Sequence, residues 1–443
     1  MRSWSFNSRG CRDRRLRQAV AWRSAALVAL SLFVSACSTE DERSSSLDQD
    51  AGGSPRETVG QTETAMDFEV LAEDFHDAGY TTASFSANAM IDADFGFDRG
   101  FDTFESPDLI EIMKARRLGE THERFRLLDR LREWNDQRDK SRPYFLFVNI
   151  FDAHDPYAVR DTNAWVPEDV SHSEIEFIAS KYEVPRALCD AVPIKKHLEV
   201  LRGLYMGNVS RADENLGVIL KIVEEGDEVT PRIVVATSDH GEHLGENRLM
   251  GHRFSVRNAA LHIPLIVTGL PGVRPAAIEE PVELRSVRAS LLCWALGRSC
   301  SEALPTESDA NRSQAIFSLY SDSVVSLPQW MLDRLDMKRE DEVPSRARAR
   351  CRDEDLVFGD MVSMIRYPMK ITWFSNNDPV LHDLSWDPAE RSNQILHQPD
   401  LAASLIQEVE AFVRKNVLER EEPIAPALSE EAAQRLKELG YIH

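Results

Sequence analysis

The chain has 443 residues, of which 42% are hydrophobic and 28% are charged, and its formal charge is −22 at pH 7. This length is enough for one large or two ordinary domains with a buried core. Such an acidic chain is a poor partner for nucleic acid, so we expect no nucleic acid to bind.

The first 36 residues have the pattern of a signal peptide. Several arginines precede a mostly apolar run over residues 25–36, which is shorter than the ~20 residues that span a bilayer. The run ends in Val-Ser-Ala-Cys, which resembles a bacterial lipobox, and the cysteine is Cys37. We predict a signal peptide over 1–36 and lipidation of Cys37 at the bacterial cell envelope, at the outer membrane because Ser38 follows. The alternative is an ordinary signal peptide with an incidental cysteine.

Residues 37–63 are mainly Ser, Gly, Asp, Glu and Gln, and such a segment predicts a flexible tether. Beyond it, apolar runs of strand length, such as 144–150 and 233–236, are separated by helical patterns. Strands of this kind indicate a mainly parallel sheet with helices on both faces. We therefore predict an α/β domain over residues 64–304.

Residues 305–443 differ in composition and predict a smaller C-terminal α+β subdomain. The first part of this segment, to about residue 356, is polar and irregular. Residues 361–374 and 380–384 have the pattern of antiparallel strands, and 399–417 that of an amphipathic helix.

Two of the cysteines beyond the export segment, Cys293 and Cys300, are close enough in sequence to pair. An oxidising compartment would permit a disulfide. Because Cys293 lies in an apolar helical run, a buried free thiol is the equal alternative.

Two clusters of acidic residues and histidines directly follow predicted buried strands, at 149–157 and at 237–243, and His252 lies a little further on. Ligands of open α/β sheets bind beyond the carboxyl ends of the strands, so we expect the clusters to lie at one end of the sheet. Carboxylate oxygens and imidazole nitrogens bind divalent cations. Gly241 is expected to let the chain turn sharply inside the second cluster. A single Asp-His pair after a strand is more often a turn or cap, but two clusters favour a site.

Several motifs resemble the sulfatase family of the alkaline-phosphatase-like hydrolases, and in particular bacterial arylsulfatase-type lipoproteins. Residues 238–246, Ser-Asp-His-Gly-Glu-His-Leu-Gly-Glu, are similar to the signature that completes a calcium site. Residues 144–157 resemble the strand that ends in a histidine next to the scissile ester. The segment 382–393 resembles the family's C-terminal hairpin.

The resemblance implies roles for four residues. Asp239 and His240 would be ligands of a divalent metal, Ca²⁺ in this family. His154 would bind the sulfate group or protonate the leaving oxygen, and His252 would also touch the sulfate. The implied substrate is a sulfated small molecule or glycan. His243 receives no role and is expected to be a solvated loop residue.

The sequence departs from the family pattern near its beginning. The family also uses two adjacent aspartates and a Cys/Ser-x-Pro-x-Arg motif, whose Cys or Ser becomes the formylglycine nucleophile. This sequence holds no Asp-Asp dipeptide, and none of its six cysteines is followed by x-Pro-x-Arg. We therefore expect weak calcium binding and an impaired or inactive hydrolase from the chain as given. A truncated gene product, a pseudoenzyme and one half of a two-chain site all fit this pattern.

Three functions remain open from the sequence. The first is a sulfatase-family hydrolase of sulfate esters at the cell envelope. The second is a phosphodiester or phosphonate-ester hydrolase of the same superfamily. The third is a non-catalytic envelope lipoprotein that keeps the fold as a binding module.

Overall fold

The computed structural model describes residues 70–107, 126–181, 195–305, 315–320 and 359–418, apart from short gaps at 89–90, 94–95, 155–156, 158–163, 226, 228–230 and 253–254. The predicted signal peptide, the lipidated Cys37 and the tether therefore lie outside the described residues. Of the described helices, none combines the length and the apolar character that a membrane span requires.

A three-stranded parallel sheet forms the first half of the fold. Its strands are β1 (Thr81–Ser86), β2 (Thr103–Glu105) and β3 (Tyr144–Asn149), in the order β2-β1-β3. The central strand β1 is buried over nearly its whole length. The predicted parallel pairing is confirmed for these strands.

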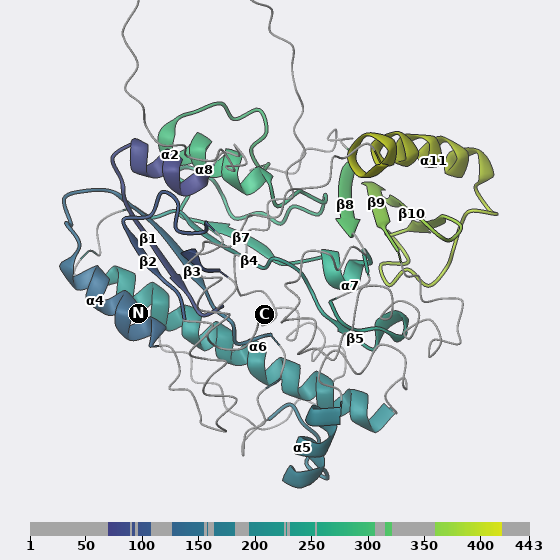
Figure 1. The fold of residues 1–443 in the computed structure, drawn as a ribbon, viewed down its shortest axis with the longest axis horizontal. Coiled ribbons are helices and arrows are strands. Elements are labelled where there is room, and N and C mark those ends of the chain that lie inside the picture. The colour runs from purple at the N-terminus through teal and green to yellow at the C-terminus, as the bar shows by residue number, and fades with distance from the viewer. Residues whose placement is uncertain are drawn as a thin grey trace, which may run out of the picture.

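Helices cover both faces of this sheet, as the sequence predicted (Figure 1). Ala83 and Phe85 of β1 pack against α4 (Leu127–Gln137) and α6 (Lys195–Glu224). On the opposite face, Phe145 of β3 packs against α2 (Leu71–Asp77) and α8 (Ser286–Leu296). This division follows from the strand geometry, because successive side chains point to opposite faces.

The next two strands differ from the prediction. β4 (Val234–Thr237) and β7 (Leu265–Thr268) pair with each other, and they are antiparallel. The described residues between them form the small hairpin of β5 (His243–Leu244) and β6 (Met250–Gly251), a 3₁₀ turn over Glu246–Arg248 within it and the short helix α7 (Asn258–Leu261). A parallel pair needs a long crossover, usually through a full helix. An apolar run carries no information about direction, so its pattern could not distinguish the two arrangements.

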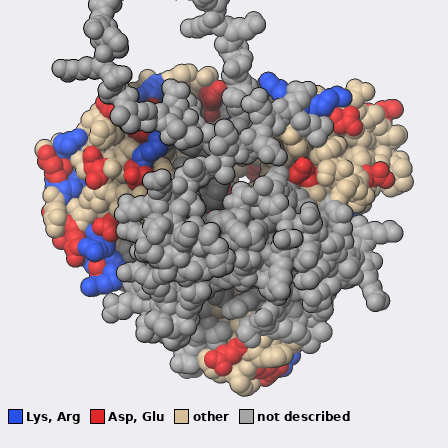
Figure 2. Space-filling model, viewed as in Figure 1, with Lys and Arg blue, Asp and Glu red and all other residues tan. Residues whose placement is uncertain are grey.

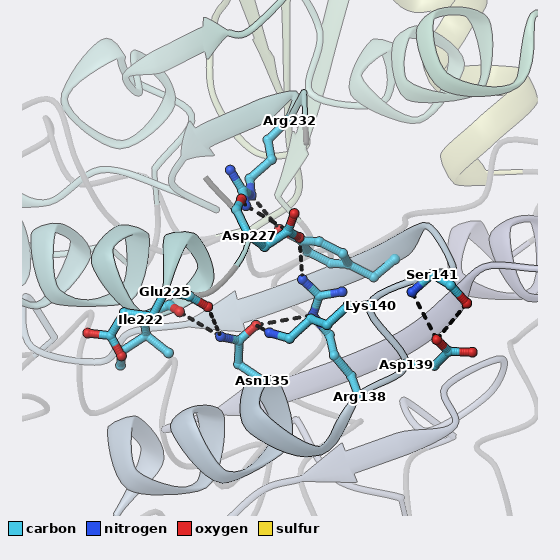
Figure 3. Close-up of polar contacts among 10 residues, drawn as sticks. Asn135, Arg138, Asp139, Lys140, Ser141, Ile222, Glu225, Asp227 and Arg232 are labelled. Atoms are coloured by element: carbon cyan, nitrogen blue, oxygen red, sulfur yellow. Dashed lines mark hydrogen bonds and ion pairs between the residues drawn. The ribbon is translucent and has the colours of Figure 1, made fainter. Parts of the chain in front are cut away.

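A buried charge network joins α4, α6 and the starts of β3 and β4 (Figure 3). The Arg138 guanidinium donates to the Asp227 carboxylate at 2.7 Å and to Asn135 Oδ1 at 3.1 Å, and its side chain is only 1% exposed. It also lies 4.3 Å from the centre of the Tyr144 ring, whose hydroxyl accepts from Arg232 at 3.0 Å. The network fixes the end of α4 against the segment that follows α6.

Ion pairs on the surface are of a different kind. In Figure 2, Lys and Arg side chains lie intermixed with Asp and Glu side chains on the described part of the surface in view. On α4, for example, Arg126 pairs with Asp129 at 2.6 Å, with both side chains largely exposed. Such pairs contribute at most about 1 kcal/mol each.

The C-terminal part of the described chain is a four-stranded antiparallel sheet in the order β11-β10-β9-β8, covered by one helix (Figure 1). Its elements are β8 (Ile316–Tyr320), β9 (Met361–Arg366), β10 (Met369–Phe374), β11 (Val380–Asp383) and α11 (Pro399–Val413), which continues in a π-helical turn over Arg414–Leu418. The predicted antiparallel strands and amphipathic helix are confirmed. β8 was not predicted, because it is a single short strand inside a stretch whose composition is otherwise polar.

Cys293 and Cys300 form a disulfide, which decides between the two alternatives that the sequence left open. Cys293 is in the last part of α8, and the helix ends at Gly297 in the left-handed conformation, with a φ of 67°. This reversal brings the chain back so that Cys300 reaches Cys293. Asp74 of α2 accepts from Arg288 and Arg298 at 2.5 and 2.6 Å, and these bonds hold α8 against α2.

Candidate functional site

Three histidines from separate parts of the chain lie side by side. His154 follows β3, His240 follows β4, and His252 follows β6. The ring centres of His240 and His252 are 4.0 Å apart with the planes at 27°, and those of His154 and His252 are 5.5 Å apart at 60°. Such a group of imidazoles can donate to or accept from the oxygens of one small anion.

Asp239 belongs to the same place, but its contacts are local. Its Oδ1 accepts from the backbone N–H of His240 at 3.0 Å, and its Oδ2 is 3.5 Å from Nε2 of the same imidazole. His240 Nδ1 is 2.9 Å from the carbonyl oxygen of Gly241. The predicted ligand pair is thus together in space, at the end of β4.

The described residues do not complete a divalent metal site around this pair. Within the described ranges, there is no group of three or more His, Cys, Asp or Glu side chains that could hold a metal ion. Calcium takes six to eight oxygen ligands, whereas Asp239 and His240 supply one carboxylate and one imidazole. The donor set present is therefore too small for the predicted ion, and no chemical step is assigned to a metal here.

A buried acid, Glu242, contacts the His252 ring. Glu242 Oε1 is 3.3 Å from His252 Nδ1, and the Glu242 side chain is only 6% exposed. Burial, with the Glu242 charge adding to it, raises the pKa of the Tyr205 hydroxyl to about 12. Tyr205, on α6, meets the ring of Tyr157 edge to face at 5.6 Å. The Glu242 carboxylate thus acts on both His252 and Tyr205.

The loop that carries His154 is fixed to the long helix α6. Asp152 Oδ1 lies 2.8 Å from Arg211 Nε, and its Oδ2 accepts from Asn215 Nδ2 at 2.7 Å. Arg211 and Asn215 are four residues apart and so face the same side of α6. Nearer its start, the same helix holds the other loop, because Arg202 donates to the Leu244 carbonyl oxygen at 3.0 Å.

An aromatic ring lies against His154 on its outer side. The ring of Phe151 stacks on His154 at 4.3 Å with the planes at 19°, and Phe151 is 36% exposed. An exposed ring beside a polar group is suited to contact a ring of a bound molecule.

Gly241 acts through close packing rather than through a turn. It is not among the glycines with positive φ, but a Cβ there would lie 2.1 Å from the carbonyl oxygen of Ala259 in α7. In addition, the Gly241 N–H donates to the Ala260 carbonyl oxygen at 2.7 Å. The expected sharp turn is thus replaced by direct contact between the site loop and α7.

His243 is buried, which contradicts the expectation of a solvated loop residue. Its exposure is 0%, and its Nε2 lies 2.9 Å from Ser255 Oγ. The loop reading failed because β5 and β6 form a small hairpin that places this side chain inward. His243 therefore has a structural environment distinct from that of the three clustered histidines.

Acid should destabilise the fold through His243. Burial lowers the pKa of its imidazole from 6.5 to about 4, so the unfolded chain takes up a proton at a higher pH than the folded chain. The stability that the neutral ring provides is complete above pH 6.5 and declines as the pH falls toward 4. We expect the free energy of unfolding, measured in urea, to be about 2 kcal/mol lower at about pH 5 than at about pH 7.5. The variant His243→Gln should show a smaller difference between the two pH values, and an unchanged difference would contradict this assignment.

The sequence pointed to the histidines but not to the residues that hold them. Glu242 is part of the quoted motif, yet nothing in its spacing indicated a contact with His252. The spacing of Arg211 and Asn215 places both on one side of a helix, and this was a usable signal. Their partner Asp152 was visible only as a member of the first acid and histidine cluster.

The parallel sheet covered by helices, with polar loops after β3 and β4 and a small antiparallel C-terminal sheet, is the fold of the alkaline-phosphatase-like hydrolases, as the similarity to solved structures of that class shows. The family model described as Sulfatase matches residues 21–297, more than half of the chain. The chain therefore belongs to the sulfatase family. The match starts inside the segment predicted to be a signal peptide, and that prediction stays a prediction.

The chain is similar in sequence to known sulfatases and similar in fold to a related hydrolase. The chain is 28% identical to arylsulfatase K of Gallus gallus over 225 residues, which cover 49% of this chain and 38% of that protein. It is 27% identical to choline-sulfatase of Rhizobium meliloti (strain 1021) over 181 residues, which cover 39% and 35% of the two chains. The crystal structure of the phosphonate monoester hydrolase of Agrobacterium radiobacter shares the fold, with a TM-score of 0.53 and 17% identity over 83% of this chain and 84% of that one.

The chain thus spans only 38% and 35% of the length of these two curated relatives. Members of the sulfatase family generally use a divalent metal.

Proposed function

We propose that this chain carries the ester-binding part of a sulfatase-family hydrolase site that acts on a sulfated small molecule or glycan. The observation that supports the proposal is the grouping of His154, His240 and His252 at the ends of three separate strands, beside Asp239. Sulfate esters are anionic, and imidazoles that donate hydrogen bonds are suitable partners for their oxygens.

In this proposal, His154 and His252 bind the sulfate oxygens. When a nucleophile attacks the sulfur and the S–O bond breaks, His154 would give a proton to the oxygen of the departing alcohol, and no residue named here is assigned as that nucleophile. The contact of Nδ1 with Glu242 fixes the orientation of the His252 ring in this proposal. The exposed ring of Phe151, stacked on His154, would contact a ring of the alcohol. Sulfatases generally use a divalent metal, and Asp239 and His240 are the residues we propose as its ligands, Ca²⁺ being the expected ion. Two ligands would hold such an ion only weakly.

The same grouping suits two other functions. Relative affinity for two esters distinguishes the first of them from a sulfatase, and an assay of turnover distinguishes the second. A phosphonate or phosphate ester carries similar oxygens, and the fold is shared with a phosphonate monoester hydrolase. A non-catalytic binding module would use the same histidines without turnover.

Calorimetric titration of the purified chain with para-nitrophenyl sulfate tests the proposal. We expect binding that weakens about 10- to 100-fold in His154→Gln and in His252→Gln, because each loses a hydrogen bond to a charged group. The matched control is His172→Gln, which removes a half-exposed histidine on α5 (His172–Lys181). Equal affinity of all four proteins would refute the site, and tighter binding of para-nitrophenyl phenylphosphonate would favour the second function.

We also propose that the chain is exported and anchored through a lipid on Cys37. It would then act at the bacterial cell envelope, at the outer membrane. The support is the apolar run that ends in Val-Ser-Ala before this cysteine. The variant Cys37→Ser should move from the membrane fraction to the soluble fraction. A variant that stays with the membranes as fully as the parent protein would disprove the anchor.

A further inference from the structure

A buried ion pair links the C-terminal sheet to residues 256–258, which lead into helix α7. Lys370, on the central strand β10, has a fully buried side chain, and its Nζ is 2.7 Å from Oε1 of Glu390, which is 2% exposed. The same ammonium donates to the Val256 carbonyl oxygen at 2.7 Å and to Asn258 Oδ1 at 3.3 Å. The Lys370 ammonium thus contacts three oxygen atoms, one each from Glu390, Val256 and Asn258.

Glu390 binds the same segment with its other groups. Its Oε2 accepts from the backbone N–H of Asn258 at 2.7 Å, and its carbonyl oxygen accepts from Arg257 at 3.1 Å. Asn258 is the first residue of α7. The pair therefore holds the start of α7 by both its backbone and its side chain.

The segment held in this way supports the site loop directly. Ala260 of α7 accepts the N–H of Gly241, the residue after His240, and Ala259 lies so close that no side chain fits at position 241. Ser255 contacts the buried His243 at 2.9 Å. Two short connections therefore join the ion pair to the loop that carries His240.

We propose that Lys370 and Glu390 are positioning residues for the histidine site, acting through α7 on His240 and, through the stacked rings, on His252. This inference rests on the proposed function, because it assigns a role at that same site. Isolated buried charges are costly, and an apolar pair of similar size would fill the space equally well. The charged pair differs from an apolar pair in that it binds two backbone groups, the Val256 carbonyl and the Asn258 N–H, together with the Asn258 side chain, and this fixes where α7 lies.

The test compares the histidine ring signals of the full chain by nuclear magnetic resonance, with signals assigned through single His→Gln variants. The variant is Lys370→Met combined with Glu390→Met, which removes both charges together and leaves none unpaired. We expect loss or displacement of the His240 and His252 signals, which depend on the stacking of the two rings, while exposed His76 and His172 stay unchanged. Affinity for para-nitrophenyl sulfate should fall about tenfold, as when supporting groups of a site are removed.

Arg366→Met is the matched control. It removes another ion pair of the same sheet, between Arg366 on β9 and Glu408 of α11, whose side chains are 41% and 37% exposed. Its histidine signals should match those of the parent chain. If the double variant does not fold, Asn258→Ala replaces it, with the same expected changes.

The positioning role is wrong if the His240 and His252 signals of the folded variant coincide with those of the parent chain. It is equally wrong if Arg366→Met displaces the same signals to the same extent. Failure of the proposed function gives a different result. The parent chain would then bind no para-nitrophenyl sulfate, but the His240 and His252 signals would still differ between the parent chain and the double variant.

Discussion

Replacing Asp227 with alanine is expected to lower the free energy of unfolding by about 3–5 kcal/mol, since it leaves a buried positive charge without its partner. Arg138 is 1% exposed and Asp227 is 8% exposed, so water cannot replace the lost carboxylate. The same change removes the group that joins the end of α4 to the segment after α6 (Figure 3).

Urea denaturation of Asp227→Ala measures this loss. The matched control is Asp129→Ala, which removes the acid of an exposed pair on α4 and should cost at most about 1 kcal/mol. A double variant, Arg138→Met with Asp227→Leu, should recover part of the stability, because it removes the most buried charge together with its partner and leaves Arg232, which is 16% exposed, without the Asp227 carboxylate. Equal losses in Asp227→Ala and Asp129→Ala would show that the network contributes little.

The second large effect concerns catalysis. The polypeptide with this sequence, purified alone, is expected to show no sulfatase turnover above background. Ester cleavage in this family needs an activated nucleophile, and none of the six cysteines is followed by x-Pro-x-Arg. Positioning and proton transfer by His154 and His252 would supply about 10²–10⁴-fold. Enzymes usually reach ~10⁶-fold or more, so the deficit is large.

An assay with para-nitrophenyl sulfate and added calcium, run beside Asp239→Ala, checks this expectation. Both proteins should give the same background rate. Robust turnover that disappears in Asp239→Ala would show that the chain builds a complete site with another nucleophile. Ser238 would then be the first hydroxyl to test, because it directly precedes Asp239.

Elements with a strong local pattern were predictable from the sequence. The apolar run before Asn149 became β3, and the long helical pattern became α6, because burial and periodicity are properties of the segment itself. The direction of β7 was not predictable in the same way. It depends on the connection after β4, whose described residues form a small hairpin with a 3₁₀ turn and one short helix.

Some residues of the candidate site were predictable from the sequence, and others were not. His154, His240 and His252 could be found because histidines after strands suggest chemistry at the end of a sheet. Lys370 and Glu390 could not be connected to them, because their contacts join residues more than a hundred positions apart. Burial of His243 was missed for a related reason, since a two-residue strand has too little pattern to show which side faces inward.

Helix α6 gives the site a common frame of reference. Its 30 residues form a rod about 45 Å long. One stretch holds the loop after β3 through Arg211, another holds the β5 segment through Arg202, and the carbonyl oxygen of Ile222 near its end accepts from Asn135 in the buried network. The spacing between these attachment points is therefore set by the rise of a single helix, not by the loops. A kink in α6 would move the His154 loop relative to the His240 loop even if every side chain of the site were left intact.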